Sequence, residues 1–276
     1  MIPISVTSVS GGRTSSYLAL HYPTDYNIFS LVRIEDALCA PKDKKLIQYV
    51  EDKIQQPFIA SAESNLTLYV LQQLEQDLGK EIIWVTGDTF ETVIKNRSMA
   101  LPNRRMRFCT TEMKMTPIFW WCYLNLFKSL DDYVVMNIGY RVDEPKRTAT
   151  DHFSFPISCK NFGEHRCNWE TIEWRDSKFP LQQHGIDNLM IKSYFAKLGY
   201  YTFPKYSNCA GCFNKSEAEL QEQFELEPEI MNWFKRYELL TGRRWNISDS
   251  LLNIERKDLT NGQLDAFSYA TCNCTD

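Results

Sequence analysis

A run of small, hydroxyl-bearing residues near the start of the chain has the composition of a phosphate-binding loop. It spans Ser8 to Ser16 and reads SVSGGRTSS. Its two glycines allow a sharp turn with positive φ, so that successive N–H groups can face one concavity at the start of a helix. The residues predicted to bind phosphate are Ser8, Ser10, Gly11, Gly12, Arg13, Thr14 and Ser15. The simpler alternative is a glycine turn in which a serine caps a helix.

A basic stretch further along the chain could neutralise the same anion. Four cations lie between Arg104 and Lys114, and no acid interrupts them before Glu112. Arg107 and Lys114 are predicted to bind phosphate oxygens through charge-assisted hydrogen bonds. Cys109 lies between them, where neighbouring positive charge favours a reactive thiolate. The alternative is a solvated basic surface.

A third group of charged residues follows a predicted buried strand over 133–139. The spacing of Arg141, Glu144 and Arg147 suits a cluster in which the carboxylate orients two arginines toward phosphate. A surface salt-bridge cluster, which contributes little stability, is the alternative. Asp88 follows the predicted strand over 81–86, where it either contributes to the site or caps the next helix.

Cysteines in the last third of the chain have the spacing of metal ligands. Cys209 and Cys212 form a C-x-x-C pair, and Cys272 and Cys274 form a C-x-C pair close to the last residue. Two close pairs of thiolates predict either a Zn²⁺ site or an iron–sulfur cluster. A redox-active pair and unliganded thiols are the alternatives.

Alternating strand and helix patterns must position these groups. Strands are predicted over 2–7, 27–34, 81–86 and 133–139, with a further edge strand over 153–159. Helices are predicted over 42–55, 64–78, 116–127, 187–198, 216–224 and 228–241. Apolar strands separated by helices predict a parallel sheet with right-handed crossovers. Ligands bind at the carboxyl ends of such strands, where the loop and the charged groups are expected to meet.

Composition limits the classes to which the chain can belong. Its 276 residues are 43% hydrophobic with a net charge of −4, which allows a sizeable core and argues against general electrostatic binding of nucleic acid. No signal pattern follows Met1 and no apolar run is long enough to span a membrane, so we expect a cytoplasmic protein without a membrane partner. We assign 1–200 to a nucleotide-binding α/β domain and 201–276 to a cysteine-containing helical region.

The order of these motifs resembles the PP-loop superfamily of ATP pyrophosphatases, and within it the phosphoadenylylsulfate (PAPS) reductase-like family. The SGGxxS loop, the C-T-x-x-x-K segment from Cys109 and the G-x-R-x-x-E-x-x-R segment from Gly139 carry the resemblance, which runs from about Ser8 to Cys212. It implies an α/β fold, an adenine nucleotide alpha hydrolase-like sandwich with a parallel sheet, bearing here a small cysteine-containing helical appendage. It also implies that ATP or a PAPS-like adenosine nucleotide binds with Mg²⁺, and it favours an iron–sulfur cluster over Zn²⁺.

Two departures from the family bear on activity. Arg13 stands where the family often has Asp, and the tail from Thr271 to Asp276 lacks the Glu-Cys-Gly-x-His motif of the reductases. We therefore expect ATP-dependent adenylation or sulfur transfer on a nucleobase or nucleic acid, with release of pyrophosphate and with a sulfur donor as a further partner. The residues assigned to catalysis are Cys109, Lys114 and Arg141. The alternatives are reductive cleavage of a sulfonucleotide and a non-catalytic nucleotide-binding subunit of a modification or defence complex.

Overall fold

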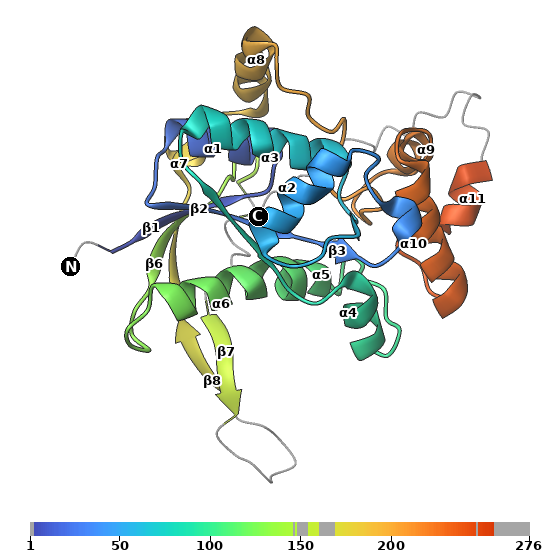
Figure 1. The fold of residues 1–276 in the computed structure, drawn as a ribbon, viewed down its shortest axis with the longest axis horizontal. Helices are drawn as coiled ribbons and strands as arrows, with labels where there is room; N and C mark the ends of the chain where they lie inside the picture. The colour runs from blue at the N-terminus through green and yellow to red at the C-terminus, as the bar shows by residue number, and fades with distance from the viewer. Residues whose placement is uncertain (1–2, 146, 148–153, 160–168, 247, 257–276) are drawn as a thin grey trace.

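A parallel sheet forms the centre of the computed structural model, which describes residues 3–145, 147, 154–159, 169–246 and 248–256. Its five strands have the spatial order β5-β2-β1-β6-β9 (Figure 1). They are β1 (Ser5–Val9), β2 (Tyr26–Leu31), β5 (Ile82–Thr86), β6 (Val134–Asn137) and β9 (Arg175–Lys178). The chain adds β2 and β5 on one side of β1, then β6 and β9 on the other. β1 and β6 therefore flank the point where the strand order reverses, at which α/β sheets bind ligands.

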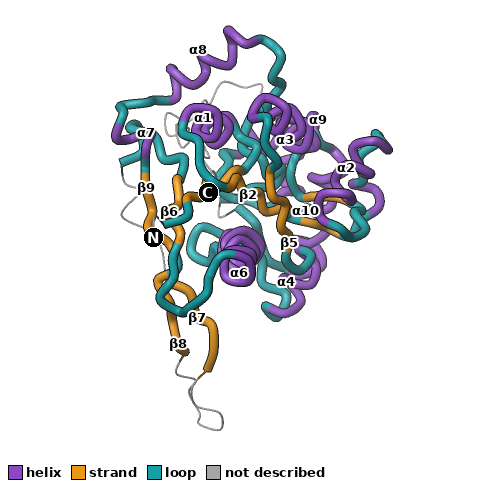
Figure 2. Tube along the Cα trace, turned by 60° about the vertical axis from the view of Figure 1, so that its left-hand side comes forward, coloured by secondary structure: helices purple, strands orange, loops and turns teal. Residues whose placement is uncertain are grey.

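Helices cover both faces of the sheet because its strands carry apolar side chains in both directions. α1 (Arg13–His21), α2 (Lys44–Ile54) and α3 (Asn65–Leu78) lie on one face, and α6 (Thr116–Asn125) lies on the other (Figures 1 and 2). In β2, Phe29 packs with the helices of the first face, whereas Ile28 packs in the cluster that includes α6. The predicted α/β fold with a parallel sheet is confirmed.

Capping residues explain where the helices begin and end. The Ser64 hydroxyl accepts a hydrogen bond from the Leu66 N–H at the start of α3, which is the usual contact of a serine cap. Gly79 ends the same helix in the left-handed conformation, with a φ of 57°. Asp187 caps the start of α8 (Asn188–Leu198) by accepting from the Met190 N–H. All six predicted helices keep their boundaries within a few residues: α2, α3, α6 and α8, and two further helices over 217–226 and 228–241.

The C-terminal helices share an apolar cluster with the rest of the chain. α9 (Glu217–Leu226), α10 (Pro228–Thr241) and α11 (Leu251–Arg256) pack together, and α4 (Phe90–Asn96) lies near α10 (Figure 1). The contact is aromatic: the Phe90 ring centroid lies 5.5 Å from that of Trp233 and 5.6 Å from that of Trp245. Ile34 of β3 (Arg33–Ile34) belongs to the same cluster. Described residues from before and after position 200 thus share one apolar cluster.

The segment predicted as an edge strand lies outside the central sheet. β7 (Ser154–Cys159) pairs antiparallel with β8 (Trp169–Glu173) in a separate two-stranded sheet that projects from the molecule in Figure 1. The edge of the central sheet is instead β9, which pairs with β6. The sequence of β9, RDSK, contains no apolar residue and so gives no periodic strand signal. The prediction for 153–159 is correct as a strand and wrong if that strand is placed in the central sheet.

A π-helical turn interrupts the helical segment on the α6 face of the sheet. α5 (Phe108–Thr110) continues into the π-helical turn η2 (Thr111–Met115), which continues into α6. Such turns insert an extra residue and are frequent at functional sites. The remaining short elements are η1 (Ala37–Cys39), β4 (Ala60–Ser61) and α7 (Pro180–Gln183).

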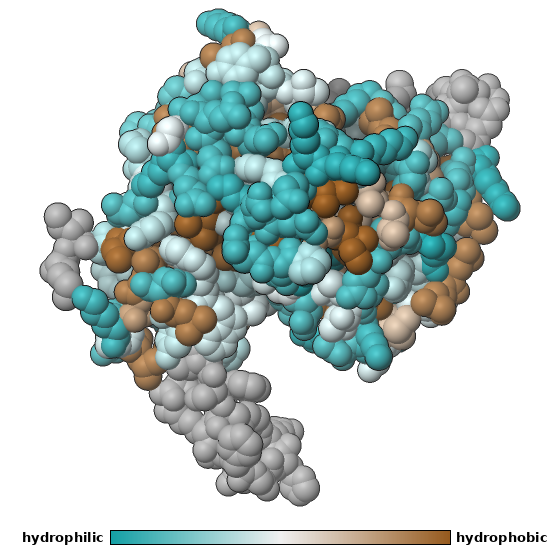
Figure 3. Space-filling model, viewed as in Figure 1, coloured by the Kyte–Doolittle hydropathy of each residue, from teal (hydrophilic) through white to brown (hydrophobic). Residues whose placement is uncertain are grey.

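The surface is largely hydrophilic on the face shown in Figure 3, where apolar side chains form separate patches. The exposed leucines of α10, Leu239 and Leu240, contribute to the apolar surface of the molecule. Among the described helices, none combines the length and the apolar character needed to cross a membrane.

Candidate functional site

The glycine loop, predicted to bind phosphate, joins β1 to α1 at the carboxyl edge of the sheet. Gly11 has a φ of 72°, the left-handed conformation that favours glycine. A Cβ atom added there would lie 2.6 Å from Cγ2 of Thr67 on α3, so both the backbone and the available space require glycine. α1 begins after Gly12, and its first N–H groups lack intrahelical acceptors. The loop therefore presents the positive end of a nine-residue helix to a ligand beside it.

Serine side chains and one distant asparagine hold this loop in place. Ser15 Oγ accepts from the Ser10 N–H at 3.0 Å and donates to the Gly12 carbonyl at 3.2 Å. The Ser10 and Ser15 hydroxyls also lie 3.0 Å apart. Asn208, from the C-terminal part of the chain, donates its side-chain N–H to the Ser10 carbonyl. The conformation of the loop thus depends on contacts from within it and from outside it.

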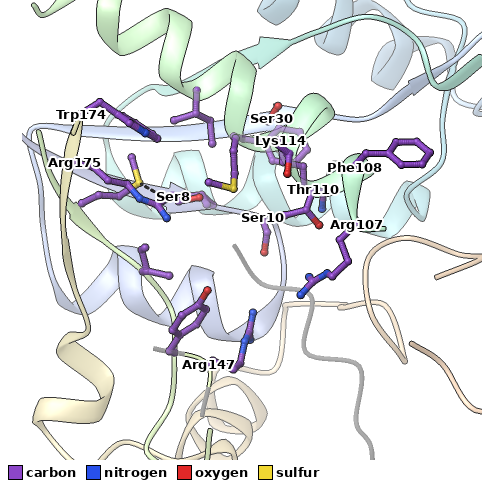
Figure 4. Close-up of a pocket in the computed structure, with 18 of the residues that line it drawn as sticks. Ser8, Ser10, Ser30, Arg107, Phe108, Thr110, Lys114, Arg147, Trp174 and Arg175 are labelled. Carbon is purple, nitrogen blue, oxygen red and sulfur yellow. Dashed lines mark hydrogen bonds between the residues drawn. The ribbon is translucent and has the colours of Figure 1, made fainter. Parts of the chain in front are cut away.

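A cavity of about 790 Å³ lies beside the loop (Figure 4). Its hydroxyl groups come from Ser8, Ser10, Ser30, Tyr140, Thr110 and Thr111, and its cations are Arg97, Arg107, Lys114, Arg147 and Arg175. Its apolar walls include Val9, Phe29, Met115, Ile118, Met136 and Ile138. Neither Asp nor Glu is found among the described residues that line it. Its size is typical of ligand sites, and the hydroxyls and cations in its lining suit an anionic ligand.

A buried carboxylate holds Lys114 at the wall of this cavity. Lys114 Nζ lies 3.2 Å from Oε1 of Glu63, whose side chain is 0% exposed. Burial raises the pKa of Glu63, and the Lys114 ammonium opposes that rise. The other oxygen, Oε2, has no hydrogen-bond partner in the part of the chain that the structure describes. Because separating the pair would leave the Glu63 carboxylate buried without a cation, the pair holds Lys114 Nζ near this position.

The Arg141, Glu144 and Arg147 side chains are arranged as their spacing predicts. Glu144 Oε2 lies 3.3 Å from Arg141 Nη1, and Glu144 Oε1 lies 3.1 Å from Arg147 Nη1. Arg141 is buried and donates to Thr14 Oγ1 at 3.1 Å, which links the cluster to the first turn of α1. Arg147 lines the cavity, with its guanidinium carbon 4.2 Å from the centroid of the Tyr140 ring. Glu144 therefore connects a structural arginine to one that a ligand can reach.

Several predicted site residues do not line the cavity. Arg13 packs its guanidinium against Phe203, 5.1 Å from the ring centroid. Asp88 is exposed beyond the end of β5, and Cys109 packs against the cluster formed with the C-terminal helices. Other predicted residues shape the loop or the arginine cluster without lining the cavity: Gly11, Gly12, Thr14, Ser15, Arg141 and Glu144. The structure thus brings Ser8, Ser10, Arg107, Lys114 and Arg147 together at one cavity.

The predicted metal ligands fall only partly within the described residues. Cys272 and Cys274 lie outside them. Burial raises the pKa of the Cys209 thiol well above its usual range, and the charge of Lys215 opposes this rise. Cys212 is buried three residues further on. In the described ranges, no group of three or more His, Cys, Asp or Glu side chains is arranged to hold a metal ion, so the four-thiolate site stays a prediction.

Three residues near the cavity were missed by reasoning from the sequence: Glu63, Trp174 and Arg175. Glu63 follows the run 58–62, which is apolar or small, and a lone acid after such a run is the available signal. Trp174 and Arg175 lie where β8 ends and β9 begins, and both line the cavity. Because β9 has no apolar pattern, its neighbours could not be placed beside β6 from the sequence.

Neither a protein-family model nor a curated protein sequence matches this chain. Its function must therefore be inferred from the cavity and the residues around it.

Proposed function

We propose that this chain is an adenosine-nucleotide-dependent enzyme of the PP-loop type, which adenylates an acceptor and releases pyrophosphate. The acceptor is a nucleobase or nucleic acid, and transfer of sulfur from a donor follows the activation. The observation that carries the proposal is the cavity beside the glycine loop, lined by hydroxyls and cations at the point where the strand order of the sheet reverses.

In this proposal the loop donates hydrogen bonds to the phosphates and the cations neutralise their charge. The N–H groups of the loop and of the first turn of α1 can donate to phosphate oxygens, as can the Ser8 and Ser10 hydroxyls. Arg107, Lys114 and Arg147 approach the same space and supply positive charge. In a cavity with apolar walls these charges are screened less than at an open surface. A polyphosphate is the anion whose charge and length suit this arrangement.

Adenylation exchanges one bond at the α-phosphorus for another. An acceptor oxygen forms a bond to the α-phosphorus while the bond to the bridging oxygen of the β-phosphate breaks, and any proton on the acceptor passes to water. Negative charge collects on the departing pyrophosphate, where Arg107 and Lys114 can stabilise it. Removing one preorganised donor of this kind typically lowers a rate by about 10²–10³. A sulfur nucleophile can then displace AMP from the activated acceptor.

The described thiols do not favour the sulfonucleotide reductase alternative. Reductive cleavage needs a thiolate that reaches the ligand. Cys109 does not line the cavity, and burial raises the pKa of the Cys122 thiol to about 12. Burial also raises the pKa of Cys209. Adenylation needs no cysteine nucleophile, and it therefore agrees better with these residues.

The donors that line the cavity do not fit a Mg²⁺ ion held by the protein. Mg²⁺ is usually bound through one or two carboxylates together with substrate phosphates, whereas the described lining residues offer hydroxyls and cations. The thiols of Cys209 and Cys212 supply half of the predicted four-thiolate set. No step above depends on Mg²⁺, zinc or an iron–sulfur cluster.

Calorimetric titration with ATP tests the binding step, and two arginine variants show where ATP binds. Arg107→Met should weaken ATP binding by about tenfold or more, because it removes a charge-assisted hydrogen bond. Arg105→Met removes the same charge two residues away, at a position that does not line the cavity, and should leave the affinity nearly unchanged.

Release of pyrophosphate from ATP, measured with nucleobases, single-stranded DNA and RNA as acceptors, tests the chemical step. A wild-type chain that does not bind ATP would refute the proposal. An equal loss of ATP affinity in Arg107→Met and Arg105→Met would mean that ATP binds through the general positive charge of this segment and not in this cavity. Binding without pyrophosphate release for every acceptor would favour a non-catalytic nucleotide-binding subunit.

A further inference from the structure

The end of the cavity opposite Arg107 carries two polar groups without a role in phosphate binding. They are Trp174 and Arg175, which Figure 4 shows on the far side of Ser8. The Arg175 guanidinium carbon lies 5.4 Å from the centroid of the Trp174 ring. Its Nη1 also contacts Sδ of Met136 at 3.6 Å. The two side chains thus form one polar corner in an otherwise apolar part of the cavity.

The indole N–H of Trp174 is the group that requires explanation. The side chain is 0% exposed, and Nε1 has no hydrogen-bond partner among the described residues. A buried donor without an acceptor lowers stability, and such groups are uncommon in native proteins. Because this side chain lines a cavity, a ligand in the cavity can supply the missing acceptor.

A second buried indole provides a useful contrast. Trp84 Nε1 also lacks a described partner. Trp84 packs on the opposite face of the sheet, edge-on to Phe29 and Tyr49 at 4.7 and 5.8 Å between ring centroids. It does not line the cavity. The two tryptophans therefore share a buried N–H without a described partner and differ in whether their side chains line the cavity.

We propose that this end of the cavity is the base subsite for the nucleotide, where the Trp174 indole N–H and the Arg175 guanidinium donate to acceptor atoms of a nucleobase. The inference rests on the proposed binding of a nucleotide. Ile118, Met136 and Ile138 line the cavity and pack in the same cluster as Trp174, and their apolar surface suits the faces of a flat ring. A phosphate group would lose its hydration against these walls, which makes this end a poor phosphate site.

The subsite gives the bound nucleotide a direction. Its base lies at Trp174 and its phosphates lie toward Ser10, Lys114 and Arg107, with Ser8 between the two ends (Figure 4). Trp174 and Arg175 only donate hydrogen bonds. They therefore recognise ring nitrogens or carbonyl oxygens of the base, and they do not select an amino group.

Calorimetry with two probes, ATP and inorganic tripolyphosphate, tests this assignment. Trp174→Phe keeps an aromatic ring and removes the N–H, so it should lower the affinity for ATP about three- to tenfold, the usual effect of one lost hydrogen bond. Its affinity for tripolyphosphate should stay at the wild-type value. Trp84→Phe, the matched control, should bind both probes as the wild type does. Arg175→Met removes the second donor and should also weaken ATP binding selectively.

Wild-type affinity for ATP in Trp174→Phe would overturn the subsite, as would equal loss of ATP and tripolyphosphate binding. A wild-type protein that binds ATP no more tightly than tripolyphosphate would overturn it too, while leaving the phosphate site intact. Failure of the wild type to bind either probe would instead refute the proposed function. Should Trp174→Phe fail to show a cooperative thermal transition, the ratio of the two affinities in Arg175→Met decides the question.

Discussion

Replacing Lys114 with methionine should leave the Glu63 carboxylate buried without its cation. The two partners differ in their access to water: the Glu63 side chain is 0% exposed and the Lys114 side chain is 17% exposed. Breaking a buried pair by removing one partner costs about 3–5 kcal/mol. Glu63→Gln should cost less, about 1–2 kcal/mol, because the remaining ammonium of Lys114 can still reach water.

The loss of stability in Lys114→Met should increase with pH. Burial raises the pKa of Glu63 above its unfolded value of 4.5, and Lys114 opposes that rise, so removing Lys114 raises the folded pKa further. Between the two pKa values the folded state then binds more protons than the unfolded state, and stability falls as the pH rises. Protonated Glu63 therefore makes its full contribution to the free energy of unfolding below the unfolded pKa. That contribution is lost as the pH rises through the folded pKa.

Urea unfolding at about pH 5 and about pH 8 measures this difference, since stability is linked to proton binding. The double variant Glu63→Gln with Lys114→Met has no titrating group at this position and should lose the pH dependence. As a control, Lys53→Met breaks a pair with Glu75 in which both side chains are partly exposed, at 16% and 18%, and should cost about 1 kcal/mol or less at either pH. Equal destabilisation of Lys114→Met at both pH values would refute the reasoning.

Three further predictions concern other parts of the chain. Gly211→Ala should destabilise the protein by about 1–3 kcal/mol in thermal unfolding, because a Cβ atom would lie 2.3 Å from Cγ of Phe234. Burial raises the pKa of Cys209, so the rate of its alkylation in the folded protein should keep rising about tenfold per pH unit above about pH 8.5. The alkylation rate of an ordinary thiol levels off near that pH. Peptide mass mapping after alkylation measures the rate at Cys209. Glu144→Gln should weaken tripolyphosphate binding in calorimetry about three- to tenfold, because Arg147 loses the carboxylate that holds it.

Each of these three predictions has an experimental outcome that would contradict it. Unchanged stability of Gly211→Ala would mean that the Phe234 ring moves aside at no cost. A plateau in the alkylation of Cys209 near pH 8.5 would mean that its thiol is not shielded as the structure shows. Full tripolyphosphate affinity in Glu144→Gln would mean that Arg147 is positioned by other contacts, and Tyr140 is the nearest described candidate.

The central strands could be predicted because their signal is local. β2 reads YNIFSL, and most of its residues are buried, so a short apolar run identifies it without knowledge of its neighbours. β9 reads RDSK and is a strand because it pairs with β6 from Val134 to Asn137. That pairing joins residues about forty positions apart, and no local pattern encodes it. In the hairpin of β7 and β8, only β7 was predicted, because the pairing with β8 also joins residues that are distant in the sequence.

The site divides in the same way between local and distant contacts. The glycine loop and the arginine cluster are each contiguous in sequence, so their residue types and spacing are sufficient to indicate anion binding. Glu63 matters because it meets Lys114, fifty-one positions later, and Asn208 because it reaches Ser10. Arg13 lies inside the motif, and no local pattern could show that its side chain packs on Phe203.

The cysteine-containing turn does not line the cavity, but it contacts residues that shape the site. Cys209 forms a β-bridge with Glu63, the residue that holds Lys114 at the cavity. Its neighbour Asn208 donates to the carbonyl of Ser10 in the phosphate loop. The turn therefore contacts both the glycine loop and the buried carboxylate that lies beside Lys114. Because Ser10, Glu63 and Asn208 are all buried, a displacement of this turn is expected to disturb these contacts.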